Sequence, residues 1–138
     1  MITQTQTTSF KAELYEGIHN LLVDTIKIAL YTAGADLGEA TESYTADHEV
    51  TGTGYAAGGV VLTGATVQAS GNTAYVSFND ASWANASFTC RGALIYNASK
   101  ANRSVAVLNF GADRTVTNKT FTVTFPANTA TSAIIRST

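Results

Sequence analysis

The feature that most constrains the fold is an alternation of apolar and polar residues between residues 87 and 125. Residues 87–97, 103–112 and 119–126 each alternate with a period of two and are separated by short polar stretches. This period is typical of strands with one buried face, and the connections are too short to hold a helix. The sequence therefore predicts three consecutive antiparallel strands. Their polar positions carry mainly Thr, Ser and Asn, which favours binding through hydrogen bonds over catalysis.

A short helix is predicted near the N-terminus. Ser9 can cap it, and the apolar residues Phe10, Leu14 and Ile18 recur at every fourth position. Gly17 lies near the expected end of the helix. A single apolar stripe on so short a helix is typical of a helix that covers the open end of a sheet.

Shorter strands are predicted around the central region. They lie at residues 26–31, 60–62, 66–68, 73–78 and 133–135, the last behind Pro126 and a polar link at residues 127–132. Together with the helix they predict a mainly β fold, an antiparallel β-sandwich of jelly-roll type. The expected core consists of apolar residues at alternating or helical positions: Phe10, Leu14, Ile28, Leu30, Val76, Phe78, Leu94, Val107, Phe121, Val123 and Phe125.

The length of 138 residues suits one domain with an independent core. Residues 1–8 are rich in Thr and Gln and lack an apolar period, so we expect a flexible or extended arm before a single β-sandwich domain at residues 9–138. Residues 32–59 form an expected long loop with six Gly and most of the acidic residues. A loop of that length in a compact domain usually performs a task.

Charged residues are sparse and unevenly distributed. They make up 13% of the chain, about half the usual share, whereas Ser and Thr together number 32. Residues 1–87 hold nine acidic and two basic residues, and residues 88–138 hold six basic and one acidic. We expect acidic residues of the first part and basic residues of the second part to form a candidate contact surface. A solvated loop is an alternative explanation for the acidic residues. The members of the candidate surface are Asp36, Glu39, Glu42, Asp47 and Glu49 on the acidic side and Arg91, Lys100, Arg103, Arg114 and Lys119 on the basic side.

Motifs for catalysis or cofactor binding are weak. The single Cys90 is expected as a small buried thiol, and Trp83 as a residue that closes the edge of the core. His19 and His48 lie in different elements, and no metal-ligand spacing occurs, so we expect no metal and no cofactor. GTGYAAGG, at residues 52–59, formally matches a dinucleotide fingerprint but leads into a strand, where that motif requires a helix.

Partners of two kinds are not expected. A sequence pI of 5.5 and the lack of basic runs oppose nucleic-acid binding. The polar start MITQTQTTSFK lacks the apolar segment of a signal peptide, and no run is apolar enough to cross a membrane.

Segments spread over most of residues 9–136 carry a resemblance. They are SFKAELYEGIHN, DTIKIALYTAGADLG, EVTGTGYAAGG, CRGALIYN, KANRSVAVLNFGADRTV and TFTVTFP, followed by AIIR. In order and spacing they resemble a family of small virion structural proteins of tailed bacteriophages. The resemblance contains no catalytic motif and carries over no functional residue. It implies a non-enzymatic part of a phage particle, outside the head or at a fibre or tail position.

The leading hypothesis is a capsid decoration or cement protein that binds the outside of the head. Its expected partners are the major capsid protein or another virion protein and further copies of itself, in a virion made in the bacterial cytoplasm. A tail, fibre or head-to-tail component is the alternative, with sugars stacked on Tyr31, Tyr44, Tyr55 and Tyr96. A glycan hydrolase using carboxylates of the acidic loop is a minor alternative.

Overall fold

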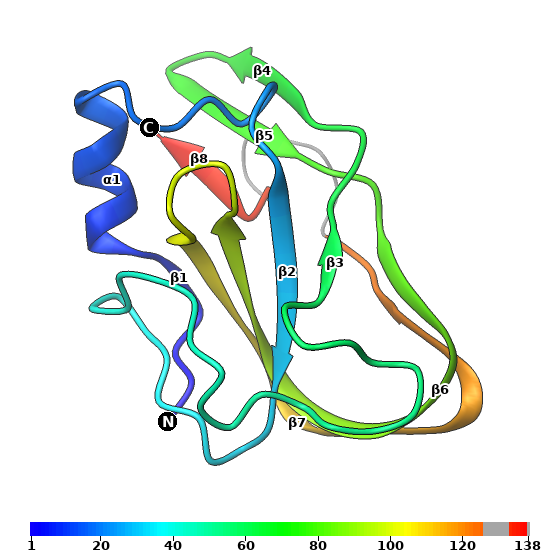
Figure 1. Ribbon diagram of the computed structural model, residues 1–138. Coiled ribbons are helices and arrows are strands. Elements are labelled where there is room, and N and C mark those ends of the chain that lie inside the picture. Colours follow the sequence, from blue (N-terminus) through cyan, green and yellow to red (C-terminus); the bar gives the residue numbers. More distant parts are fainter. Residues whose placement is uncertain (126–132, 138) are drawn as a thin grey trace.

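The computed structural model describes residues 1–125 and 133–137, which form two antiparallel sheets and one short helix (Figure 1). The five-stranded sheet has the order β1-β7-β6-β2-β3, and the three-stranded sheet has the order β4-β5-β8. The bounds are β1 Thr5–Gln6, α1 Thr8–Tyr15, β2 Ile26–Tyr31, β3 Val60–Val61, β4 Thr66–Ser70, β5 Thr73–Ser77, β6 Ala81–Asn97, β7 Arg103–Val123 and β8 Ile135–Ser137. Buried residues of both sheets belong to one core, so the expected mainly β, sandwich-like fold is confirmed.

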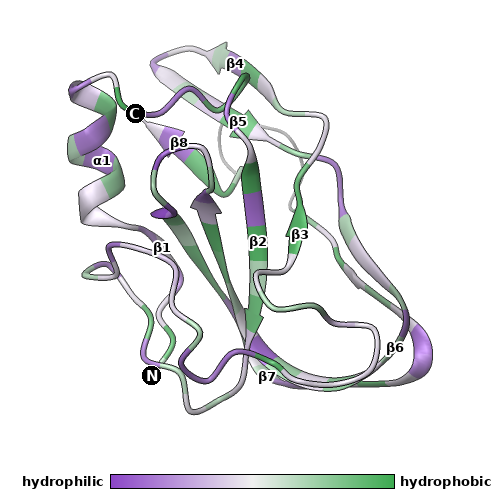
Figure 2. Cartoon of the chain, in the orientation of Figure 1, coloured by the Kyte–Doolittle hydropathy of each residue, from purple (hydrophilic) through white to green (hydrophobic). Residues whose placement is uncertain are grey.

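The predicted division of residues 87–126 into three strands is wrong. Residues 81–97 and 103–123 form two long strands that pair along their length, and β7 continues through the polar stretch at which we expected a turn. The ladder shifts register at several points, and both Gly111 and Asn118 have a left-handed φ, of +81° and +51°. Bulges of this kind bend a strand without ending it. The bend of β7, orange in Figure 1, is accordingly hydrophilic in Figure 2.

The helix begins earlier than predicted. Thr7, not Ser9, is the N-cap, and its hydroxyl oxygen accepts the backbone N–H of Phe10 at 3.3 Å. The helix ends at Tyr15, so Ile18 is not part of it, and Gly17 follows with a φ of +72°. Phe10 alone is buried on this helix; Leu14 is 38% exposed and does not belong to the core.

The core prediction holds for most of the strand residues. Those that are buried as expected, with Phe10, are Ile28, Leu30, Phe78, Leu94, Val107 and Val123. Val76, Phe121 and Phe125 are partly buried and pack against the core. Cys90 is buried, as expected of a small thiol, and burial raises its pKa to about 12. Trp83 is also buried and packs with Tyr55 and Phe121.

A second cluster of buried residues lies on the other face of the five-stranded sheet. Its members are Ile2, Ala29, Tyr31, Ala35, Leu37, Leu94, Tyr96 and Val107. Strand β2 is therefore buried on both faces, because the arm at residues 1–6 and the long loop cover the face that the main core leaves open.

β8 begins at Ile135, two residues later than the predicted start of the last strand, while Pro126 and the polar link at residues 127–132 lie outside the described residues. In the described part of the chain, no helix combines the length and apolar character needed to span a membrane.

Candidate functional site

The long loop is held against the sheet by backbone hydrogen bonds from several parts of the chain. Thr3 N–H donates to Leu37 at 2.9 Å and Thr8 N–H donates to Glu39 at 2.9 Å. On the other side, Tyr44 N–H donates to Asn102 and Ser104 N–H donates to Glu42, both at 2.9 Å. The acidic part of the loop is thus fixed between the N-terminal arm and the turn that joins β6 to β7.

A buried carboxylate fastens the rest of the loop. Glu49 is 9% exposed and accepts hydrogen bonds from the hydroxyls of Tyr44 and Tyr55, each at 2.5 Å, and from Gly58 N–H at 2.8 Å. The hydroxyl of Tyr55 also accepts the N–H of Leu30, in β2, at 2.9 Å. We call Glu49, Tyr44, Tyr55 and Gly58 the Glu49 cluster. The hydroxyl of Tyr55 joins this cluster to β2.

The hydroxyls of Tyr96 and Tyr31 also donate hydrogen bonds to the loop, in their case to backbone carbonyls. Tyr96 OH donates to Gly58 at 2.6 Å, and Tyr31 OH donates to Thr45 at 2.6 Å. Burial, together with the nearby Glu49, raises the pKa of Tyr31, Tyr55 and Tyr96. Tyr31 and Tyr96 are almost completely buried, so the expectation that they stack on sugars is wrong.

The expected acidic residues divide into two environments. Asp36, Glu39, Glu42 and Asp47 are exposed, whereas Glu49 lies inside the cluster described above. Two open hollows share Asp36, Leu37 and Thr45; one is also lined by Glu39, and the other by Asp47 and His48. We call the four exposed carboxylates and these hollows the acidic surface. Among the described residues, no group of three or more His, Cys, Asp or Glu is placed to hold a metal ion.

The expected basic residues do not form one opposing face. Lys100 and Arg103 lie in and beside the β6–β7 turn and pair with Asp24 and Glu13 at 2.9 and 2.8 Å. The backbone of Arg103 also forms an isolated antiparallel β-bridge with Ser43 of the acidic loop.

The other basic residues lie on the long hairpin. Arg91 is 3.5 Å from Asp113, and a guanidinium nitrogen of Arg114 donates to the carbonyl of Phe110 at 3.1 Å. Lys119 is exposed and lies opposite Ala86. Among the described residues, the ion pairs that join the acid-rich residues 1–87 to the basic residues 88–138 lie at the β6–β7 turn and involve Glu13 and Asp24.

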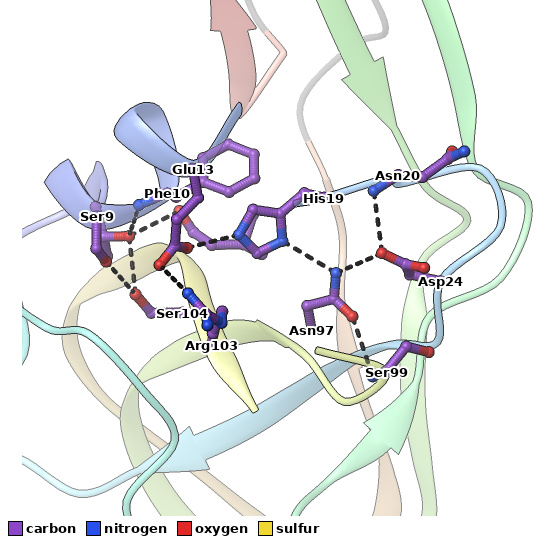
Figure 3. A network of polar contacts seen from close by, with 12 residues as sticks. Ser9, Phe10, Glu13, His19, Asn20, Asp24, Asn97, Ser99, Arg103 and Ser104 are labelled. Atoms are coloured by element: carbon purple, nitrogen blue, oxygen red, sulfur yellow. Dashed lines mark hydrogen bonds and ion pairs between the residues drawn. The ribbon is translucent and has the colours of Figure 1, made fainter. Parts of the chain in front are cut away.

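A network of polar side chains surrounds His19 beneath α1 (Figure 3). The amide nitrogen of Asn97 contacts His19 Nδ1 at 3.0 Å and Asp24 at 2.8 Å, while its oxygen accepts Ser99 N–H at 3.0 Å. An amide nitrogen can only donate, so Nδ1 of His19 accepts and Nε2 carries the proton. Nε2–H then donates to Glu13 at 2.8 Å.

Two carboxylates of this network remain ionised. Burial works to raise the pKa of Asp24, but hydrogen bonds from Asn20 N–H, Asn97 and Lys100 outweigh it and lower the pKa to about 2. Burial also opposes ionisation of Glu13, yet hydrogen bonds with His19 and Arg103 hold its pKa below the ordinary value.

The network ties several elements together. The side chain of His19 is fully buried, and both of its ring nitrogens form hydrogen bonds inside the network. No local sequence pattern predicts this network, because its members come from α1, the loop after α1 and the residues at and beside the β6–β7 turn.

Comparisons with family models, with curated proteins and with solved structures gave no match to this chain. The resemblance to phage virion proteins therefore stays an expectation.

Proposed function

We propose that this chain is a non-enzymatic structural protein of a tailed-phage particle, a capsid decoration protein that binds the outside of the head. The observation that carries the proposal is the acidic surface. Its carboxylates are exposed, but the loop that bears them is fastened by the backbone hydrogen bonds at Leu37, Glu39, Glu42 and Tyr44 and by the Glu49 cluster. A preordered surface loses little conformational entropy when it binds.

The chemistry of the surface supports a role in assembly. Few charges and many hydroxyls allow copies to lie close together without strong mutual repulsion. Glu49, His19 and Asp24, whose side chains are buried, are engaged in internal hydrogen bonds. We propose the major capsid protein as the partner, with many weak contacts repeated over the symmetric lattice supplying the avidity.

The test uses particles from which this protein has been stripped. We expect these particles to lose DNA at a lower temperature and after a milder osmotic shock than intact ones, and the purified chain should restore the resistance. Equal stability of stripped and intact particles would refute the cement role. An image of the intact particle that places the protein at the tail or at a fibre would instead favour the alternative location.

A further inference from the structure

Among the described residues, the three-stranded sheet has an edge strand, β4, that lacks the usual protection. β4, at the outer edge of this sheet in Figure 1, consists of five exposed residues and pairs with β5 without a register shift. Its sequence, TVQAS, contains no charged residue and no proline. Proteins usually protect an exposed edge with charges, prolines, bulges or extreme shortness, because its free backbone groups can pair with another strand.

The other edges of the described sheets have such protection. β1 and β3, at the edges of the five-stranded sheet, are two residues long. Beyond its pairing with β2, strand β6 has register shifts between Trp83 and Gly92, and Ser87 forms a bridge with Thr53 of the long loop. Beyond its pairing with β1, strand β7 is bent at Gly111 and Asn118 and carries Asp113, Arg114 and Lys119. β8 has three residues, one of them Arg136. β4 is therefore the edge best suited to pairing.

The turn next to β4 determines which backbone groups are free. Ser70 and Thr73 are paired across a two-residue turn, in which Gly71 has a φ of +59°. Residues that flank such a turn form a hydrogen-bonded pair, and bonded and non-bonded pairs alternate along the ladder. The N–H and C=O groups of Val67 and Ala69 consequently point away from β5.

We propose that β4 is a self-association site, at which a second copy of this chain adds its own β4 in antiparallel orientation. With the two-fold axis at Gln68, the free backbone groups of Val67 in one copy meet those of Ala69 in the other. The side chains match as well, since Val67 lies opposite Ala69 and Thr66 lies opposite Ser70. No like charges meet, so the edge is complementary to itself.

An apolar groove beside β4 adds to this surface. The groove runs between α1 and the three-stranded sheet and includes Phe10, Leu14, Leu21, Val67 and Val76. Leu14 and Val67 are 38% and 51% exposed. A second copy at β4 covers Val67 and so removes apolar surface from water in addition to forming backbone hydrogen bonds. Five paired residues make a small interface, so the isolated chain should associate weakly and reversibly.

The first test measures the molar mass by analytical ultracentrifugation from about 10 µM to about 1 mM, a range that covers weak association. We expect a concentration-dependent monomer–dimer equilibrium. Ala69→Pro removes the outward N–H but no bond to β5, so it should weaken dimerisation at least about tenfold. A chain that stays monomeric over the whole range, or a dimer that Ala69→Pro leaves intact in a folded protein, would overturn the proposal.

A second test introduces charges at Gln68, on the proposed two-fold axis, and avoids a proline substitution. Gln68→Lys and Gln68→Glu should each weaken dimerisation, because like charges lie directly opposite, and an equal mixture of the two should associate more strongly than either variant alone. Thr122→Lys and Thr122→Glu are the matched controls at an exposed position of β7, and they should leave dimerisation unchanged. Failure of the mixture to associate, or an equal effect of the controls, would also overturn the proposal. Neither test depends on particles, so failure here is separate from failure of the proposed function.

Discussion

Glu49 connects three donors from three positions in the loop through one carboxylate. Replacing it by Ala leaves two tyrosine hydroxyls and the Gly58 N–H without their acceptor in a buried site. Each lost partner costs about 1–3 kcal/mol, so we expect Glu49→Ala to lower the free energy of unfolding by roughly 3 kcal/mol or more. Urea denaturation measures the change. Asp47→Ala, at an exposed carboxylate two residues away, should change it by less than about 0.5 kcal/mol. Similar values for the two variants would contradict the role of the Glu49 cluster.

Asp24 should make the stability depend on pH. Its pKa is about 2 in the folded chain, below the ordinary value of 3.8, and its side chain is 7% exposed. A carboxylate with a lowered pKa stabilises the fold above its ordinary pKa and loses that contribution as the pH falls toward the folded value. Asp24 should therefore contribute up to about 2 kcal/mol at neutral pH, and this should disappear between about pH 5 and pH 2.

The measurement is the free energy of unfolding of the natural chain and of Asp24→Asn across that pH range. The difference between the two should shrink as the pH falls, leaving only the pH-independent cost of the substitution. Parallel pH profiles would show that Asp24 titrates in the same way in the folded and unfolded states.

At the scale of elements, Gly59 and Gly111 allow the cost of backbone strain to be distinguished from the cost of a steric clash. Gly59 precedes β3, has a φ of +79°, and a Cβ there would lie 1.8 Å from the carbonyl oxygen of Ile28 in β2. Gly111, in the bend of β7, has a φ of +81° but open space around such an atom. Gly111→Ala therefore loses only the conformational freedom of glycine, whereas Gly59→Ala also forces β2 and β3 apart.

We expect thermal unfolding to separate these two variants clearly. Gly111→Ala should cost about 1 kcal/mol, and Gly59→Ala should cost several times as much. Equal losses would mean that the approach of the glycine link to β2 is looser than the structure indicates.

For the whole molecule, the proposed attachment to a capsid predicts a dependence on salt. Screening shortens the reach of exposed charges to about 8 Å at physiological ionic strength and about 3 Å at 1 M. Occupancy of the protein on particles should therefore fall as salt rises. It should fall already at low salt in the variant that combines Asp36→Asn, Glu42→Gln and Asp47→Asn. Glu49 is left unchanged because it is buried. Occupancy that ignores both salt and these substitutions would show that the acidic surface is only solvated.

The sequence by itself determined the features that depend on local periodicity. Residues 26–31 alternate and form β2 with the predicted bounds, and the strands predicted at residues 66–68 and 73–78 correspond to β4 and β5, which pair across Gly71 and Asn72. The exposed carboxylates of the loop were also predictable, because charged side chains rarely lie in a core without a partner.

Only the tertiary structure determined where residues depart from these local patterns. Glu49 is buried because Tyr44, Tyr55 and Gly58, brought together by folding, satisfy its oxygens. The polar stretch of β7 remains a strand because β6 supplies backbone hydrogen-bond partners on both sides of the bulges. The residues next to this stretch in the sequence do not indicate that pairing. His19 meets Asn97 only through the packing of α1 and its following loop against the β6–β7 turn. Contacts between residues that are distant in the sequence depend on the whole fold. The local periodicity of the sequence does not specify which distant residue a given side chain will contact.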